Sequence, residues 1–204
     1  MNIVIATQNK GKVVEIKEAF KSMNVNVYTM EEIGLNPDIE ENGTTFEENA
    51  LIKVNELHRE LPEEDKMKYI IMSDDSGLEI EALDNKPGIY SARYNGVDTP
   101  WTTKNELMVE EMKDFENRNA RFVSCIAIRF PCGETQIVRG IVEGDIAYEL
   151  KGDRGFGYDR IFIPKGYDVT FAEMSLEEKG EFSHRARAIE FAKEVLEEKI
   201  QSFK

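Results

Sequence analysis

Two adjacent carboxylates are the clearest candidates for chemistry in this sequence. Asp74 and Asp75 follow the apolar run 69–72 and precede Ser76 and Gly77. Successive side chains of a strand point to opposite faces of a sheet, so one carboxylate can point into a cleft while the other faces elsewhere. Carboxylates suit Mg²⁺, which takes one or two of them together with phosphate oxygens of a substrate. The alternative is an Asx-turn closed by the glycine.

A polar loop near the amino terminus has the composition of an anion site. The run 7–12 lies between a predicted strand at 2–6 and a helical pattern that includes Val13. Free backbone N–H groups and the helix dipole favour an anion at such a junction, and Lys10 and Lys12 add positive charge. The spacing is not that of a Walker A loop, and a plain turn is the alternative.

Further carboxylates could serve the same chemistry. Glu40 and Glu41 precede a predicted helix that carries Lys53. One of these carboxylates could join a metal site while the lysine contacts phosphate. Ordinary surface charge is the alternative for each of them.

Aromatic and basic groups in the second half of the chain could hold a base. Phe156 and Tyr158 lie among the three glycines of the segment 152–159, where a ring can stack on a base or enter the core. Lys179 and the run 183–185 bring basic groups to the predicted start of a helix. The histidine in that run could equally be a structural neighbour of the helix cap.

The elements that must position these groups follow from residue periodicity and from capping boxes, in which Ser or Thr is followed three residues later by Glu. We expect strands at 2–6, 69–72, 121–130, 135–143 and 161–163, and helices from about 13, at 45–61, from 103, from 175 and from 183 to about 203. Helices and strands interleave at both ends around a central β-meander, which predicts an α/β fold with a mixed sheet. Ligands bind beyond the carboxyl ends of such strands.

The composition limits the possible partners. The chain has 204 residues, with 26 Lys and Arg against 40 Asp and Glu, and this size favours one soluble domain. The net charge of −14 argues against nucleic-acid binding, which needs a basic face. No apolar run approaches the roughly 18 residues of a membrane span, and the amino terminus lacks the pattern of a signal peptide, so we expect a cytoplasmic protein with no membrane partner.

Five motifs together are more specific than any one of them. They are Thr-x-Asn-x-Gly-Lys at 7–12, Ser-Asp-Asp-Ser-Gly-Leu at 73–78, Pro-Gly-Ile-Tyr-Ser-Ala-Arg at 87–93, Gly-Phe-Gly-Tyr-Asp at 155–159, and Glu-Glu-Lys followed by Ser-His-Arg ending at 185. In motif order, and along essentially its whole length, the sequence resembles the inosine/xanthosine triphosphate pyrophosphatase family of house-cleaning enzymes.

This resemblance implies Mg²⁺-dependent hydrolysis of ITP, dITP and XTP to the monophosphate and pyrophosphate. It also implies a homodimer, and a single domain over 1–204 with an elongated mixed sheet, flanking helices and a cleft between two lobes. Asp75 would accept the proton, Asp75 and Glu41 would bind the metal, and base choice would rest on the 6-oxo group. The residues implied to bind substrate are Thr7, Gln8, Asn9, Lys10, Gly11, Lys12, Lys53, Ser76, Phe156, Gly157, Tyr158, Asp159, Lys179, His184 and Arg185.

Some points stay open at this stage. Asp74 is the rival of Asp75 for either role. Gln8 stands where the family often has glycine, and Arg160 stands where proline is frequent, although neither removes a named chemical group. The alternative functions are a pyrophosphatase of the same fold for pyrimidine or modified-guanine triphosphates, as in the Maf-like family, and a nucleotide sensor without turnover.

Overall fold

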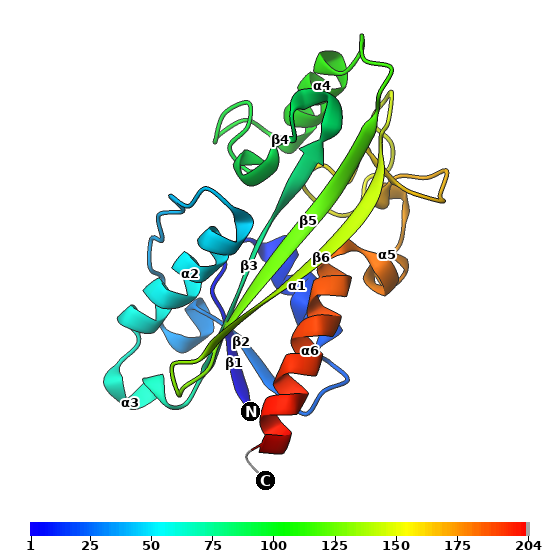
Figure 1. The fold of residues 1–204 in the computed structure, drawn as a ribbon. Coiled ribbons are helices and arrows are strands. Elements are labelled where there is room, and N and C mark those ends of the chain that lie inside the picture. The colour runs from blue at the N-terminus through cyan, green and yellow to red at the C-terminus, as the bar shows by residue number, and fades with distance from the viewer. Residues whose placement is uncertain (203–204) are drawn as a thin grey trace. The chain divides into compact units, whose positions relative to one another are not determined.

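The computed structural model describes the backbone of residues 1–202 and the side chains of residues 1–199. Figure 1 shows the elements in chain order. The strands are β1 (Asn2–Ile5), β2 (Asn26–Thr29), β3 (Ile70–Ile80), β4 (Lys86–Pro87), β5 (Asn119–Arg129), β6 (Thr135–Ile146) and β7 (Phe162–Pro164). The helices are α1 (Lys10–Ala19), α2 (Phe46–Glu60), α3 (Glu63–Lys66), α4 (Trp101–Glu111), α5 (Leu176–Phe182) and α6 (His184–Ser202).

The strands form one mixed sheet in the order β2-β1-β3-β5-β6-β7, with β4 paired to β3. β1 runs parallel to β2 and β3, whereas β4 and β7 run antiparallel to their neighbours. The turn 130–134 joins β5 to β6 through hydrogen bonds between Phe130 and Glu134 (2.8 Å) and between Gly133 and Phe130 (2.9 Å). The predicted α/β class, mixed sheet and central hairpin are therefore confirmed.

The chain forms two compact units, which we call unit 1 and unit 2. Unit 1 comprises Met1–Asp75, Ser124–Gly140 and α6 from Arg185 onward, and unit 2 comprises Ser76–Val123 and Ile141–His184. Strand β3 therefore passes from one unit to the other between the second aspartate and the serine.

The core of unit 1 follows the alternation of its strands. Ile3 and Ile5 of β1 pack with residues of α1 and α6, while Val4 between them packs with residues of α2. The same alternation recurs at Ile71 of β3, which joins the cluster on the α2 side. Figure 1 shows α6 and α2 on opposite sides of these strands. Period-two burial therefore places helices on both faces.

Unit 2 has its own core around aromatic residues. Leu78 and Ile80 from the second half of β3 pack with Met108 of α4 and Phe162 of β7. Phe122 of β5 lies in the same cluster, with its ring centroid 4.7 Å from that of Phe162. The core of unit 2 includes Tyr158, so the segment 156–159 is anchored to this apolar cluster.

The structure corrects several predicted element ends. β3 does not end at 73–77 but continues to Ile80, so the two aspartates lie inside a strand and not in an Asx-turn. Helix α4 begins at Trp101, two residues before the predicted cap Thr103, because Pro100 precedes it with a φ of −57° that suits a helix start. The short helix α3 occupies a stretch predicted to be a break.

The two ends of the chain also differ from expectation in detail. Helix α1 begins at Lys10, so half of the predicted loop 7–12 is the first turn of that helix. The predicted helix end near Phe203 lies outside the described residues. No helix within the described residues is long and apolar enough to cross a membrane.

We predict that Gly144→Ala destabilises the protein by about 1 to 3 kcal/mol, the usual cost of overpacking. A Cβ at Gly144 would lie 2.2 Å from the backbone oxygen of Ile163 and 2.7 Å from the Phe162 ring. Gly180→Ala is the matched control, because a Cβ there meets nothing within 4 Å and alanine favours a helix. Urea denaturation measures both variants, and equal stabilities would contradict the packing argument.

Candidate active site

Asp74 is fully committed to contacts within unit 1. The side chain is fully buried, Arg185 Nε donates to its Oδ2 (2.7 Å) and Ser124 Oγ donates to its Oδ1 (2.9 Å). Lys12 Nζ lies 3.5 Å from Oδ2. Burial alone would raise the pKa of Asp74, but the charges of Arg185 and Lys12 outweigh it and hold the pKa well below the usual range. This carboxylate is a fixed anion with both oxygens occupied.

Asp75, on the opposite face of β3, has different partners. Lys53 Nζ donates to its Oδ1 (2.8 Å) and lies 3.2 Å from Glu41 Oε2. Asp75 Oδ2 is buried and accepts no hydrogen bond from any described residue. Burial, together with the nearby Glu41 carboxylate, raises the pKa of Asp75 although Lys53 opposes this shift. The structure thus brings together Glu41, Lys53 and Asp75, as the sequence predicted.

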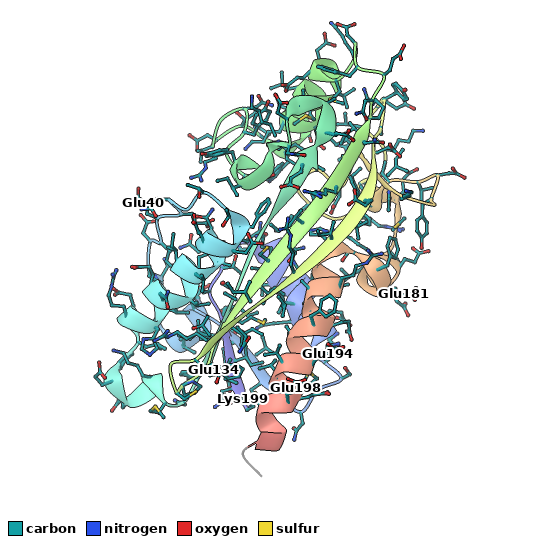
Figure 2. The ribbon with its side chains drawn as sticks, in the orientation of Figure 1. Glu40, Glu134, Glu181, Glu194, Glu198 and Lys199 are labelled. Atoms are coloured by element: carbon teal, nitrogen blue, oxygen red, sulfur yellow. The ribbon has the colours of Figure 1, made fainter. Side chains whose placement is uncertain are left out.

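Glu40 and Glu41 differ although they are neighbours in the chain. Glu41 is half-buried at the lysine, and the positive charge of Lys53 lowers its pKa in spite of the burial. Glu40 is exposed, and Figure 2 shows its side chain at the surface. Burial lowers the pKa of Lys53, but the carboxylates of Asp75 and Glu41 outweigh it and raise this pKa above its usual value. Glu41 is therefore the one of the pair that belongs to the cluster.

This cluster fits a Mg²⁺ ion. Asp75 Oδ2 is a buried acceptor without a donor, and such an atom is costly unless a cation or water satisfies it. The described residues contain no group of three or more side chains that could hold a metal. Two carboxylates, with the remaining positions left to water and phosphate, is the usual arrangement for Mg²⁺.

The amino-terminal loop is shaped by its own hydrogen bonds. Asn9 caps α1, and its Oδ1 accepts from the N–H groups of Gly11 (2.9 Å) and Lys12 (3.2 Å). Thr7 Oγ1 accepts from the N–H of Asn9 (3.2 Å). Three backbone amides of this predicted anion site, those of Asn9, Gly11 and Lys12, therefore already have acceptors within the chain.

The side chains of this loop point to different places. Lys12 Nζ donates to the backbone oxygen of Asp74 (3.1 Å), and burial lowers the pKa of this lysine. Gln8 Nε2 donates to Asn36 Oδ1 (3.1 Å), whereas Lys10 is exposed. Triphosphate binding by residues 7–12 stays a prediction. Lys12 is the residue of this loop whose ammonium group pairs with the Asp74 carboxylate.

In unit 2, Asp159 organises the glycine-rich segment. Its Oδ2 accepts from Lys179 Nζ (2.7 Å) and from the N–H of Phe156 (2.8 Å). Lys179 Nζ also lies 5.1 Å from the centre of the Phe156 ring. Gly155 has a φ of +71°, and a Cβ there would lie 2.1 Å from Asp159 Oδ2, so only glycine allows this close approach. The half-buried Phe156 ring is thereby held beside a buried ion pair.

Tyr158 and His184 are both buried and pack against aromatic rings. The Tyr158 ring is buried and meets the edge of Trp101 at 5.3 Å. His184 is buried and stacks on Phe122, with ring centroids 4.6 Å apart. Contacts of these two residues with a base stay predictions, as do those of Gly157 in the same segment.

Arg185 and Ser76 lie on either side of the division between the units. Arg185 belongs to unit 1, where it is buried with Asp74 and also pairs with Glu15. Ser76 is half-buried and begins unit 2, directly after Asp75. The reading of the 6-oxo group by Arg185 stays a prediction, and the structure adds a second task for this residue, the neutralisation of two carboxylates.

Sequence reasoning missed residues that act only through distant partners. Ser124 and Glu15 hold the two sides of the Asp74 and Arg185 pair, yet neither lies in a recognisable motif. No local signal could have found them, because the paired positions are 50 and 170 residues apart in the chain. Arg160, a departure from the family pattern, donates from Nε to the backbone oxygen of Gly152 (3.0 Å) within the same segment.

The chain thus combines a mixed α/β sheet with a buried cluster of two carboxylates and a lysine. The family model described as the Ham1 family matches residues 3–195, and the chain belongs to this family. The resemblance inferred from the motifs is therefore confirmed.

Known proteins similar to this chain cover almost all of it. A dITP/XTP pyrophosphatase of Oceanobacillus iheyensis is 45% identical over 92% of this chain and 94% of its own, and one of Bacillus subtilis is 43% identical over 95% and 96%. The structure of the Staphylococcus aureus Ham1 protein has a TM-score of 0.84 at 38% identity, covering 98% of this chain and 100% of that one. These matches confirm the fold class independently of the motifs.

We predict that Asp74→Asn lowers the free energy of unfolding at neutral pH by about 3 to 5 kcal/mol, because it leaves Arg185 buried without its main partner. The folded pKa of Asp74 lies below its unfolded value of about 3.9, so this stabilisation is present at neutral pH and is lost only as the pH falls through the folded pKa. Urea unfolding at pH 7 measures the loss. A variant as stable as wild type would contradict the role given to this pair.

Proposed function

We propose that this chain hydrolyses non-standard purine nucleoside triphosphates, namely ITP, dITP and XTP, to the monophosphate and pyrophosphate, and so cleanses the nucleotide pool. The observation that carries the proposal is the buried cluster of Glu41, Lys53 and Asp75, in which one carboxylate oxygen has no donor among the described residues. The names of the similar pyrophosphatases support it over nearly the whole chain length.

Asp75 is the better candidate for the proton acceptor. An attacking water must approach the α-phosphorus in line and lose a proton, and this needs positioning and charge neutralisation more than covalent help. Asp75 Oδ2 accepts no hydrogen bond from a described residue, so it is available for that proton. Both oxygens of Asp74 already accept hydrogen bonds and its pKa is lowered, so we assign Asp74 a structural role.

Glu41 and Asp75 would hold Mg²⁺. When bound there, the ion supplies positive charge that offsets the charge of the phosphates. Lys53 contacts both carboxylates, lowers the pKa of Glu41 and opposes the rise of the Asp75 pKa, and a phosphate oxygen would replace one of its contacts. Lys12 brings a second positive charge to the middle of β3, at the backbone oxygen of Asp74. Gln8, Asn9, Lys10, Gly11, Thr7 and Ser76 would complete the phosphate contacts.

The base would be held by unit 2. Phe156 offers a ring face, and Lys179 offers a cation that Asp159 fixes in place. A 6-oxo group accepts a hydrogen bond, whereas the amino group of adenine leaves a buried donor unpaired, and such a mismatch can discriminate by about 10⁴ to 10⁵. Gly157, Tyr158, His184 and Arg185 would shape the remainder of the base site.

We also propose a single domain with two lobes that works as a homodimer. The net charge of −14 disfavours a polyanionic partner such as nucleic acid. The proposed substrates are metabolites of the cytoplasm, where we place the enzyme.

The function is tested by incubating the purified chain and Mg²⁺ with ITP, XTP, GTP, ATP, dTTP and CTP in separate reactions. Release of pyrophosphate, and not orthophosphate, from ITP and XTP is the expected result, because it reports substrate class and cleavage position together. Preferential turnover of dTTP or CTP would instead support the Maf-like alternative. Binding of ITP without any turnover would support the sensor.

We predict that Asp75→Asn lowers kcat for ITP by about 10² to 10⁴, the usual contribution of general acid–base catalysis, while ITP binding remains measurable. Glu40→Gln is the matched control, since it removes an exposed carboxylate near the cluster and should leave kcat unchanged. Single-turnover kinetics and equilibrium dialysis separate the two quantities. Turnover like that of wild type in the Asp75 variant would remove this residue from the mechanism.

A further inference from the structure

Two buried asparagines, one in each unit, each hold a loop that carries candidate site residues. Asn49 lies in α2 and Asn105 lies in α4, and both are 0% exposed. Asn49 Oδ1 accepts from the N–H of Gly43, and Asn105 Nδ2 donates to the backbone oxygen of Gly157, both at 2.9 Å. Neither asparagine touches the charged clusters described above, yet each fixes the backbone next to one of them.

Asn49 fixes the segment that presents Glu41. A Cβ at Gly43 would lie 2.7 Å from Asn49 Oδ1, so the backbone approaches the helix as closely as only glycine allows. The next residue, Thr44, donates hydrogen bonds from its N–H and its hydroxyl to the Glu48 carboxylate, in the same helix turn as Asn49. Asn49 and Lys53 are four residues apart on α2 and so share one face. The hydrogen bond between Gly43 and Asn49 therefore fixes the backbone two residues after Glu41, whose carboxylate pairs with Lys53.

Asn105 fixes the segment that presents the Phe156 ring. Its Nδ2 group donates both to Gly157 and to the backbone oxygen of Trp101 (2.6 Å), one turn earlier in α4. Trp101 in turn packs its ring against Tyr158. Gly157 has a φ of +66°, so the carbonyl group that the amide holds belongs to a backbone turn that few side chains allow. Helix α4 thus contacts two successive residues of this segment, Gly157 through Asn105 and Tyr158 through Trp101.

Both asparagines retain a polar group that the described residues do not satisfy. Asn49 Nδ2 and Asn105 Oδ1 are buried and have no hydrogen-bond partner among those residues. An apolar side chain of similar size would avoid this cost, so filling space does not account for an amide at either position. The hydrogen bond to the loop glycine is the feature that an apolar residue could not supply.

We propose that Asn49 is the positioning residue for the metal-binding carboxylate Glu41, and that Asn105 is the positioning residue for the base-holding segment 156–159. This inference rests on the proposed function. It predicts that the two residues control different properties of one reaction, the cation requirement and the choice of purine.

The test is a crossover between Asn49→Ala and Asn105→Ala, each variant being the control for the other. Asn49→Ala should raise the Mg²⁺ concentration for half-maximal activity about tenfold or more, as loss of a group that orients a metal ligand does, and leave the ITP to ATP ratio of kcat/KM unchanged. Asn105→Ala should lower that ratio about tenfold and leave the Mg²⁺ requirement unchanged. Neither quantity depends on the fraction of folded enzyme.

Two binding measurements avoid turnover altogether. Mn²⁺ titration followed by electron paramagnetic resonance reports the metal affinity without substrate. The fluorescence of Trp101, the one tryptophan of the chain, reports ITP and ATP binding beside Tyr158. Mn²⁺ affinity should fall in the Asn49 variant alone, and the ITP to ATP affinity ratio should fall in the Asn105 variant alone.

A conservative substitution separates positioning from general structure. Asn49→Asp keeps an oxygen that can accept from Gly43, near the start of a helix where negative charge is tolerated, and should restore the Mn²⁺ affinity. Asn105→Asp replaces a donor by an acceptor facing two carbonyl oxygens and should not restore selectivity.

Equal shifts of both properties in both alanine variants, or no shift in either, would overturn the inference. Wild-type enzyme that releases no pyrophosphate from ITP would instead refute the proposed function, while the Mn²⁺ and fluorescence measurements would still decide the roles of the two asparagines.

Discussion

The buried pair of Asp74 and Arg185 is the interaction on which unit 1 depends. It joins β3 to the start of α6 across 111 residues of sequence. Removing two charges from water is costly, and the cost is offset only because Ser124, Lys12 and Glu15 complete the surrounding contacts. Asp74 therefore joins the sheet to its last helix, and Asp75, the next residue on the strand, has no part in that contact.

The alternation of β3 turns this structural constraint into a division of roles. Because adjacent side chains face opposite ways, Asp75 is kept out of the Asp74 network and meets Lys53 and Glu41 instead. The first carboxylate is ionised under all ordinary conditions, while the second retains an acceptor oxygen and a raised pKa. Two identical residue types next to each other thus differ in chemistry because of their partners.

Local pattern was sufficient for most elements but not for the central cluster. The strand at β1 and the capped helices at α2 and α5 follow from periodicity and capping residues, whereas the meeting of Glu41, Lys53 and Asp75 was expected only from the family resemblance, because spacing did not choose between Glu40 and Glu41. The continuation of β3 past Asp75 was missed because Asp, Ser and Gly are usual turn residues, and tertiary pairing overrode that preference. Contacts between segments far apart in the chain produce no local sequence pattern, so the partnership of Ser124 with Asp74 and of Glu15 with Arg185 could not be predicted.

The two units carry different kinds of side chain, which the proposed function would use for different parts of a nucleotide. The Glu41 and Asp75 carboxylates and Lys53 belong to unit 1, while the Phe156 ring and the buried Lys179 belong to unit 2. The triphosphate is common to every nucleotide, so the phosphate contacts proposed in unit 1 do not distinguish bases, whereas Arg185, also in unit 1, is proposed to contact the base. Under the proposed function, selectivity would come from segment 156–159 together with Arg185, and changes in that segment would alter the preferred purine without altering the chemistry of bond cleavage.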